Sequence, residues 1–244
     1  MSSFRQQKNR LFTLLAQPDW QYKIQEELQN SQNLQEYVSP LLSFLLRHEV
    51  RWQSIWSFGL LMDLIVQKDK EQARNIMRRL MWSMNEESGN IGWGIPECMA
   101  SCFAKNALLA SEYAKILYSY AIDTGDDDNF IEHEPLRLGV YWGIAHMARS
   151  LPSSINKSLA TLASALAEAN PQAKIIALWG ILGMLQAKDI KAQMHLTPDA
   201  LKDITRLATQ CLNEDDAQAE IFDMQELKVY YMHSLAQQVL DLLR

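Results

Sequence analysis

The chain repeats one short pattern three times: a basic residue, a tryptophan five positions later, and then glycine and methionine. The basic residues are Arg51, Arg137 and Lys174, and the tryptophans are Trp56, Trp142 and Trp179. The tryptophans are 86 and 37 residues apart, which corresponds to two periods of about 43 residues and one slightly shorter period. Periods of this length are typical of stacked helical hairpins. The pattern therefore predicts an all-α fold, an α-solenoid of about five helical hairpins.

The composition supports a folded, mainly helical chain. Of the 244 residues, 48% are hydrophobic and 21% are charged, as in ordinary globular proteins. Only 9 glycines and 7 prolines interrupt the chain, which favours helices over many short strands. We predict one repeat domain over residues 1–244, with an irregular N-terminal cap over 1–48, repeats over 49–212 and a C-terminal capping helix over 223–244.

Apolar periodicity and capping residues predict the individual helices. The predicted hairpins pair residues 51–67 with 70–84, 96–105 with 107–122, 135–149 with 153–169, and 171–186 with 198–212. Asn170 and Thr197 each precede a proline and are favoured as N-caps. Residues 33–47 are predicted as helical, and the helix either kinks at Pro40 or begins near Ser39 with the proline in its first turn. A closing helix over 224–243 has an apolar stripe made by Leu227, Tyr231, Leu235, Val239 and Leu242.

Charge and cysteine content narrow the class of partner and the compartment. A formal net charge of −6 and a pI near 5.4 disfavour nucleic acid, whose binding depends on Lys and Arg. The basic strip at Lys70, Arg74, Arg78 and Arg79 is interpreted as the solvated face of a helix. Three cysteines suggest no disulfide framework and suit a reducing compartment. With no secretory signal and no apolar run long enough to cross a membrane, we expect a soluble cytoplasmic protein.

The predicted first helices resemble those of the HEAT-repeat family. In that family the first helix of each pair carries a proline, then a basic residue, then small and apolar residues that end in Leu-Gly. Pro135 to Arg137 and Pro171 to Lys174 fit this start, and Phe58-Gly59 fits the finish. More narrowly, residues 51–212 resemble the short bacterial HEAT-like repeats also found in phycobilin lyase subunits. Trp142 and Trp179 replace the usual small residue, and the second repeat lacks the basic position. The resemblance implies a bacterial helical-repeat protein and leaves its function open.

The segment from Trp82 to Glu97 is the first candidate binding site. It contains three of the nine glycines and two tryptophans. Glycine allows close approach of another chain, and an exposed tryptophan is a rigid apolar anchor. The predicted binding residues of the segment are Trp82, Asn85, Glu86, Glu87, Trp93 and Glu97. The alternative is that Trp93 folds back over its own hairpin as a plug.

The basic residues of the repeat are the second candidate site. Arg51, Arg137 and Lys174 occupy the same helical position and could line a concave surface that receives an acidic peptide or ligand. Alternatively, each bonds to carbonyl groups or acids of the neighbouring repeat.

Two His-Glu pairs are candidate metal ligands. His48-Glu49 and His133-Glu134 each precede a basic-to-tryptophan helix, and imidazole with carboxylate suits non-haem iron. A HEAT-repeat hydroxylase family binds two irons through such pairs, but there they lie within the helix. The alternative is that each carboxylate interacts with the helix dipole in the first turn.

The predicted function is that of a non-enzymatic scaffold or adaptor that binds a protein partner and uses no cofactor. It would use its concave face and the Trp82 to Glu97 segment. The alternative is a metal- or cofactor-handling enzyme, either a di-iron oxygenase acting through the His-Glu pairs or a lyase-like chromophore chaperone.

Overall fold

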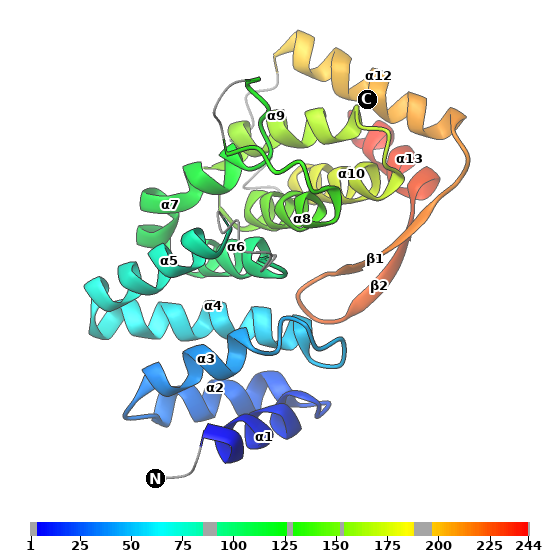
Figure 1. The fold of residues 1–244 in the computed structure, drawn as a ribbon. Helices are drawn as coiled ribbons and strands as arrows, with labels where there is room; N and C mark the ends of the chain where they lie inside the picture. Colours follow the sequence, from blue (N-terminus) through cyan, green and yellow to red (C-terminus); the bar gives the residue numbers. More distant parts are fainter. Residues whose placement is uncertain (1–3, 85–91, 126–128, 152–153, 188–196, 244) are drawn as a thin grey trace. The chain divides into compact units, whose positions relative to one another are not determined.

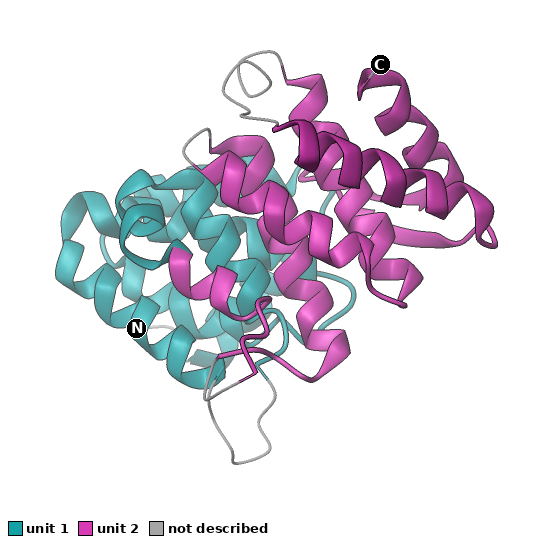
Figure 2. Cartoon of the chain, turned by 90° about the horizontal axis from the view of Figure 1, so that it is seen from above, with its two compact units in different colours: residues 1–114 teal, residues 115–244 magenta. Residues whose placement is uncertain are grey.

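A computed structural model of the chain describes residues 4–84, 92–125, 129–151, 154–187 and 197–243. Figure 1 follows the chain from its first helix to its last. The chain divides into two compact units, residues 1–114 and 115–244, which Figure 2 colours separately. The boundary lies inside helix α7 (Ala107–Ser119).

The described elements of the first unit are all helical. They are α1 (Phe4–Leu15), α2 (Trp20–Asn30), the 3₁₀ helix η1 (Leu34–Tyr37), α3 (Val38–Leu42), α4 (Arg51–Lys68), α5 (Lys70–Met84), α6 (Ile95–Lys105) and the first part of α7. Helix α4 packs against α2, α3, α5 and α6. Asp69 alone separates α4 from α5, which pack as a tight hairpin, and Asn106 alone separates α6 from α7.

Helices α4 and α6 approach closely at a glycine. A Cβ atom added to Gly59 of α4 would lie 2.6 Å from the carbonyl oxygen of Ser101 in α6. Around this contact Ile55, Phe58 and Phe103 are fully buried. The glycine of the repeat pattern is therefore required by packing between the first helices of successive hairpins.

The second unit contains helices and one small sheet. Its elements after α7 are α8 (Glu134–Ser150), α9 (Ile155–Leu166), α10 (Pro171–Gln186), α12 (Pro198–Asn213), β1 (Gln218–Phe222), β2 (Leu227–Tyr231) and α13 (Met232–Leu243). Helix α10 packs against α8, α9, α13 and β1, and its residues from Ala173 to Leu185 are all buried. A helix that is apolar on every side is stable only when other elements surround it. Helix α10 is therefore the core element of this unit.

The contact between α8 and α10 repeats the glycine packing of the first unit. A Cβ atom on Gly180 would lie 2.6 Å from the Cβ of Ala145. Two predicted helix starts are also confirmed. The Asn170 side chain accepts a hydrogen bond from the Gln172 amide, and the Thr197 hydroxyl accepts one from the Ala200 amide.

The predicted all-α class and the solenoid-like arrangement of helical hairpins are confirmed within each unit. Of the four predicted hairpins, α4 with α5 and α8 with α9 pack directly against each other, whereas α12 packs mainly against α9 and α13. Among the described residues, no helix is both long and apolar enough to cross a bilayer.

Two predicted helices are wrong in their extent. Residues 33–47 form η1, α3 and then turns: α3 begins at Val38 with Pro40 in its first turn, as one of the two alternatives predicted, but it ends at Leu42. The predicted closing helix over 224–243 begins eight residues later, at Met232. The C-terminal cap over 223–244 is therefore part hairpin and part helix.

An antiparallel ribbon occupies the start of that predicted helix. Residues of β1 and β2 pair from Gln218 with Tyr231 to Phe222 with Leu227. The turn is closed by the Asp223 carboxylate, which accepts hydrogen bonds of 3.0 Å from the amides of Gln225 and Glu226. Met224 takes a left-handed φ of 79° in this turn. The β-branched and aromatic residues of Leu227–Tyr231 favour a strand once this turn forms.

Candidate functional site

The basic residue that begins the repeat pattern is ion-paired in the first unit. Nη2 of Arg51, in the first turn of α4, lies 2.5 Å from Oε1 of Glu97, in the first turn of α6. Glu97 is only 3% exposed. Burial raises the pKa of the Glu97 carboxyl above its ordinary value, and the Arg51 guanidinium partly opposes that rise. This pair joins two successive hairpins.

The same basic position is ion-paired twice in the second unit. Arg137 of α8 donates to both carboxylate oxygens of Glu168, just after α9, at 3.2 and 3.4 Å, and to the carbonyl of Ile131 at 2.7 Å. Lys174 of α10 donates to both carboxylate oxygens of Glu214, just after α12, at 2.5 and 2.6 Å. Each pair connects the start of one helix to the end of the next described helix.

These contacts favour the structural interpretation of the three basic residues. The Lys174 side chain is 9% exposed and the Arg137 side chain 12% exposed, so neither presents a free cation on the surface. Lys174 does line a cavity of about 490 Å³ beside Arg206, but its ammonium group is held by Glu214. A binding role for the three residues stays a prediction.

The Trp82 to Glu97 segment is only partly described. Asn85, Glu86 and Glu87 lie outside the described residues. Trp82, near the end of α5, has 74% of its surface exposed, while Trp93 is half-buried. Glu97 is buried in its pair with Arg51, so its carboxylate is unavailable to a partner in this structure. The part of the segment that is both described and exposed is therefore Trp82.

The outer face of α5 continues from Trp82 towards its start. Arg78 lies one turn before Trp82, and its side chain is 51% exposed. Arg79 is also exposed and, in the described part of the chain, makes no ion pair or hydrogen bond. Arg74, by contrast, is held by Glu112 and Glu71. An exposed indole thus lies beside two exposed guanidinium groups on one helix.

In one of the two His-Glu pairs, the histidine has a local partner of the kind found at helix starts. Nδ1 of His133 accepts a hydrogen bond from the Leu136 amide at 3.3 Å, so His133 is the N-cap of α8. The Glu134 carboxylate accepts a hydrogen bond from the Asn170 side chain. His48 and Glu49 lie in an exposed turn before α4. Among the described residues no group of three or more His, Cys, Asp or Glu side chains could hold a metal ion, so the metal site stays a prediction.

The cysteines offer no reactive thiol in this structure. Cys98 and Cys102 of α6 and Cys211 of α12 are all buried and free. Burial raises the pKa of each thiol above its ordinary value. These thiols are therefore protonated at neutral pH and pack as small apolar groups.

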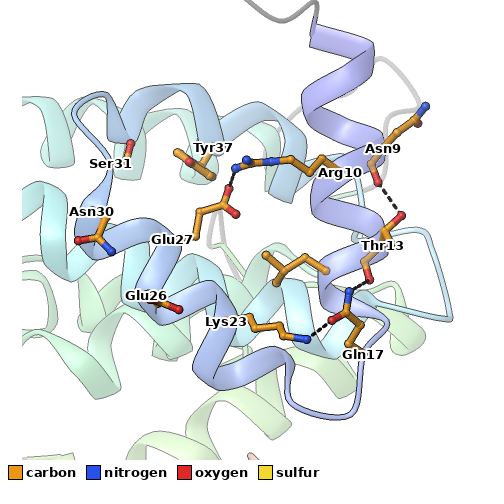
Figure 3. Close-up of a pocket in the computed structure, with 11 residues that line it drawn as sticks. Asn9, Arg10, Thr13, Gln17, Lys23, Glu26, Glu27, Asn30, Ser31 and Tyr37 are labelled. Carbon is orange, nitrogen blue, oxygen red and sulfur yellow. Dashed lines mark hydrogen bonds and ion pairs between the residues drawn. The ribbon is translucent and has the colours of Figure 1, made fainter.

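Sequence reasoning missed a groove in the first unit, which Figure 3 shows from the side of α1 and α2. It has a volume of about 880 Å³, and Arg10 of α1 and Glu27 of α2 form an ion pair across it. Lys23 donates to the side chain of Gln17 at its other end. The groove lies within residues 1–48, which have no repeat pattern. Its charged side chains pair with one another, and this pairing gives no indication of a ligand.

Comparisons with known proteins give structural neighbours and no family. No family model and no curated protein matches the chain. A designed armadillo repeat protein in complex with peptide (KR)4 is 15% identical and has a TM-score of 0.49. The alignment covers 96% of this chain and 98% of that one. An engineered protein of known crystal structure is 12% identical with a TM-score of 0.47, and the alignment covers 97% and 96% of the two chains.

Proposed function

We propose that the protein is a non-enzymatic scaffold that binds a protein partner through the exposed face of α5, with Trp82 as the anchor. The observation that carries the proposal is the 74% exposure of Trp82. Burying an indole on binding removes a large apolar surface from water at little cost in side-chain entropy. Tryptophan and arginine are also the residues most enriched among those that dominate binding energy.

The surroundings of Trp82 support an interface. The inner side of helix α5 is packed into the first unit through four buried residues, Ala73, Ile76, Met77 and Leu80. This packing holds the helix, and therefore its exposed outer face, in a fixed position. Arg78 and Arg79 would form a polar rim beside the indole and favour carboxylates on the partner. Trp93, half-buried at the far end of the segment, is proposed as a secondary contact.

Alanine variants of two equally exposed aromatic residues test the proposal. Tyr22 of α2 is 71% exposed and serves as the matched control for Trp82. Proteins captured from the native lysate are quantified with the wild type, Trp82→Ala and Tyr22→Ala. We expect at least one partner to be lost with Trp82→Ala and retained with Tyr22→Ala. Equal loss or equal retention of every captured protein in the two variants would remove Trp82 from the interface.

Glu97 is a poor choice for such a test. Its substitution would disturb the contact with Arg51 between α4 and α6, so lost binding would not separate a partner contact from altered folding. Trp93→Ala is tested separately, with its unfolding transition measured beside its binding.

The narrower relationship and the location belong to the same proposal. The fit of Pro135 to Arg137 and of Phe58-Gly59 to the short bacterial HEAT-like repeats of phycobilin lyase subunits supports a bacterial helical-repeat origin. Three free cysteines support a reducing compartment such as the cytoplasm.

A further inference from the structure

Both outer edges of the ribbon in the second unit lack a partner strand among the described residues. Its two-stranded sheet contains only β1 and β2 among the described residues. The backbone bonds from Met232 to Ala217 and from Asp223 to Glu226 fix the pattern of the ladder. By alternation, the amide and carbonyl groups of Leu227 and Val229 point away from β1. The outward carbonyl of Phe222 on β1, by contrast, accepts a hydrogen bond of 3.1 Å from Nε1 of Trp142.

The edge of β2 is also apolar. Leu227, Val229 and Tyr231 share one face of the ribbon and are 46%, 47% and 51% exposed. Every other described element that exposes a large hydrophobic side chain exposes only one. Figure 1 shows the ribbon extending away from the end of α12 and the start of α13. Outward backbone groups combined with an exposed apolar face form the surface to which an extended peptide adds as a further strand.

The charge around the ribbon indicates what kind of peptide fits. Between Arg206 and Arg244, Lys228 is the only lysine or arginine, against seven acidic residues. Lys228 is itself paired with Asp223 and Glu226. Glu220 lies directly opposite Val229 on β1, is exposed, and makes no ion pair or hydrogen bond among the described residues. A second copy of this acidic ribbon would be repelled, whereas a basic strand would be attracted.

We infer that the edge of β2 binds an extended segment of a partner protein that carries lysine or arginine at alternate positions. The segment pairs with the outward backbone groups of Leu227 and Val229. The aliphatic parts of its lysine or arginine side chains pack over Val229. Their charged groups reach Glu220 on β1, which is two strand spacings, about 10 Å, from the backbone of the added segment. This surface is separate from Trp82, and the inference stands without the proposed function.

A synthetic peptide of alternating threonine and arginine, seven residues long, is the probe, and its threonine-glutamate counterpart is the comparison. We expect the basic peptide to bind the full chain in fluorescence polarisation and to slow amide exchange at Leu227 and Val229. Val229→Pro removes one outward donor and leaves the bonds between β1 and β2 intact, so affinity falls by about tenfold. Val229→Thr keeps the donor and the branched side chain, and its affinity stays within about twofold.

A charge variant supplies a test that is independent of proline. Glu220→Gln is expected to lower the affinity for the basic peptide by about fivefold. Glu26→Gln in α2 is expected to leave that affinity unchanged. Trp82→Ala is expected to retain peptide binding, which separates this surface from the proposed interface on α5. Binding that is absent at about 1 mM peptide, equal for both peptides, or unchanged in both Val229→Pro and Glu220→Gln would overturn the inference. So would a peptide-free dimer that Val229→Pro dissociates, because a second copy would then occupy the edge.

Discussion

Arg51 and Glu97 form an ion pair between the first turns of two successive first helices, with Nη2 and Oε1 2.5 Å apart and Glu97 almost fully buried. Oε2 of the same carboxylate is buried and has no hydrogen-bond partner among the described residues. Arg51 is therefore the main group that compensates this costly buried charge.

Removing Arg51 should destabilise the first unit. Arg51→Ala leaves the Glu97 carboxylate buried and unpaired, and we expect it to lower the free energy of unfolding by about 3 kcal/mol. Arg79→Ala removes an exposed guanidinium that has no ion pair or hydrogen bond among the described residues, and it should change the same quantity by less than about 0.5 kcal/mol. Urea unfolding followed by circular dichroism measures both. Similar values for the two variants would show that the ion pair contributes nothing to stability.

Glu97 should give the stability a recognisable pH dependence. Its pKa in the folded chain is raised above its ordinary value of 4.5 by burial, with partial opposition from Arg51. Above pH 4.5 the unfolded chain has lost this proton while the folded chain still holds it, so the free energy of unfolding falls as pH rises through the folded pKa. Glu97→Gln cannot titrate and should lack this contribution. The free energy of unfolding is measured from pH 4.5 to 7.5 for both proteins. An equal decrease in the wild type and in Glu97→Gln would contradict the raised pKa of Glu97.

The close contacts between α4 and α6 and between α8 and α10 should not tolerate an added methyl group. Gly59→Ala places a Cβ against the backbone carbonyl of Ser101, and Gly180→Ala places one against Ala145. We expect each to cost about 2 kcal/mol of unfolding free energy, because the neighbouring helix must move. In Gly183→Ala the Cβ meets the side chain of Arg149, with its Nε 2.6 Å away, and that flexible chain can give way. Thermal unfolding should therefore rank Gly183→Ala as the mildest of the three.

The indole N–H groups of Trp142 and Trp179 should contribute differently to the stability of the fold. Nε1 of Trp142 donates to the Phe222 carbonyl, whereas Nε1 of Trp179 is buried without a partner among the described residues. Both tryptophan-to-phenylalanine variants lose the same volume, but Trp142→Phe also leaves a carbonyl of β1 without its donor. We expect it to cost about 1 kcal/mol more than Trp179→Phe and to speed amide exchange in the ribbon. Equal costs would show that this hydrogen bond does not hold the ribbon.

Local signals were sufficient to predict the helices of the repeats. Asn170 and Thr197 act as the caps that the residue types predicted, and the ends of α5 and α10 agree with apolar periodicity. The ribbon was missed because Leu227, Tyr231 and Leu235 also fit a helical stripe, and that stripe hid the turn at Asp223 and the strand-forming residues after it.

The candidate site was harder to predict for a physical reason. The acids that pair with the basic residues lie 46, 31 and 40 residues further along the chain, so only the folded hairpins bring them together. Burial of Glu97 and exposure of Trp82 likewise depend on which faces of α5 and α6 turn inward, and the spacing of glycines and tryptophans in the sequence does not determine that.

Photo-crosslinking from position 82 tests the proposed scaffold function most directly. Benzoylphenylalanine is placed at Trp82 in one variant and at the equally exposed Tyr22 in another, and both are irradiated in living cells of the native host. We expect a discrete protein adduct from position 82 that position 22 does not give. The yield of this adduct should fall when Arg78 and Arg79 are both changed to alanine. The absence of any adduct specific to position 82, at matched expression and with both variants folded, would contradict the proposed scaffold function.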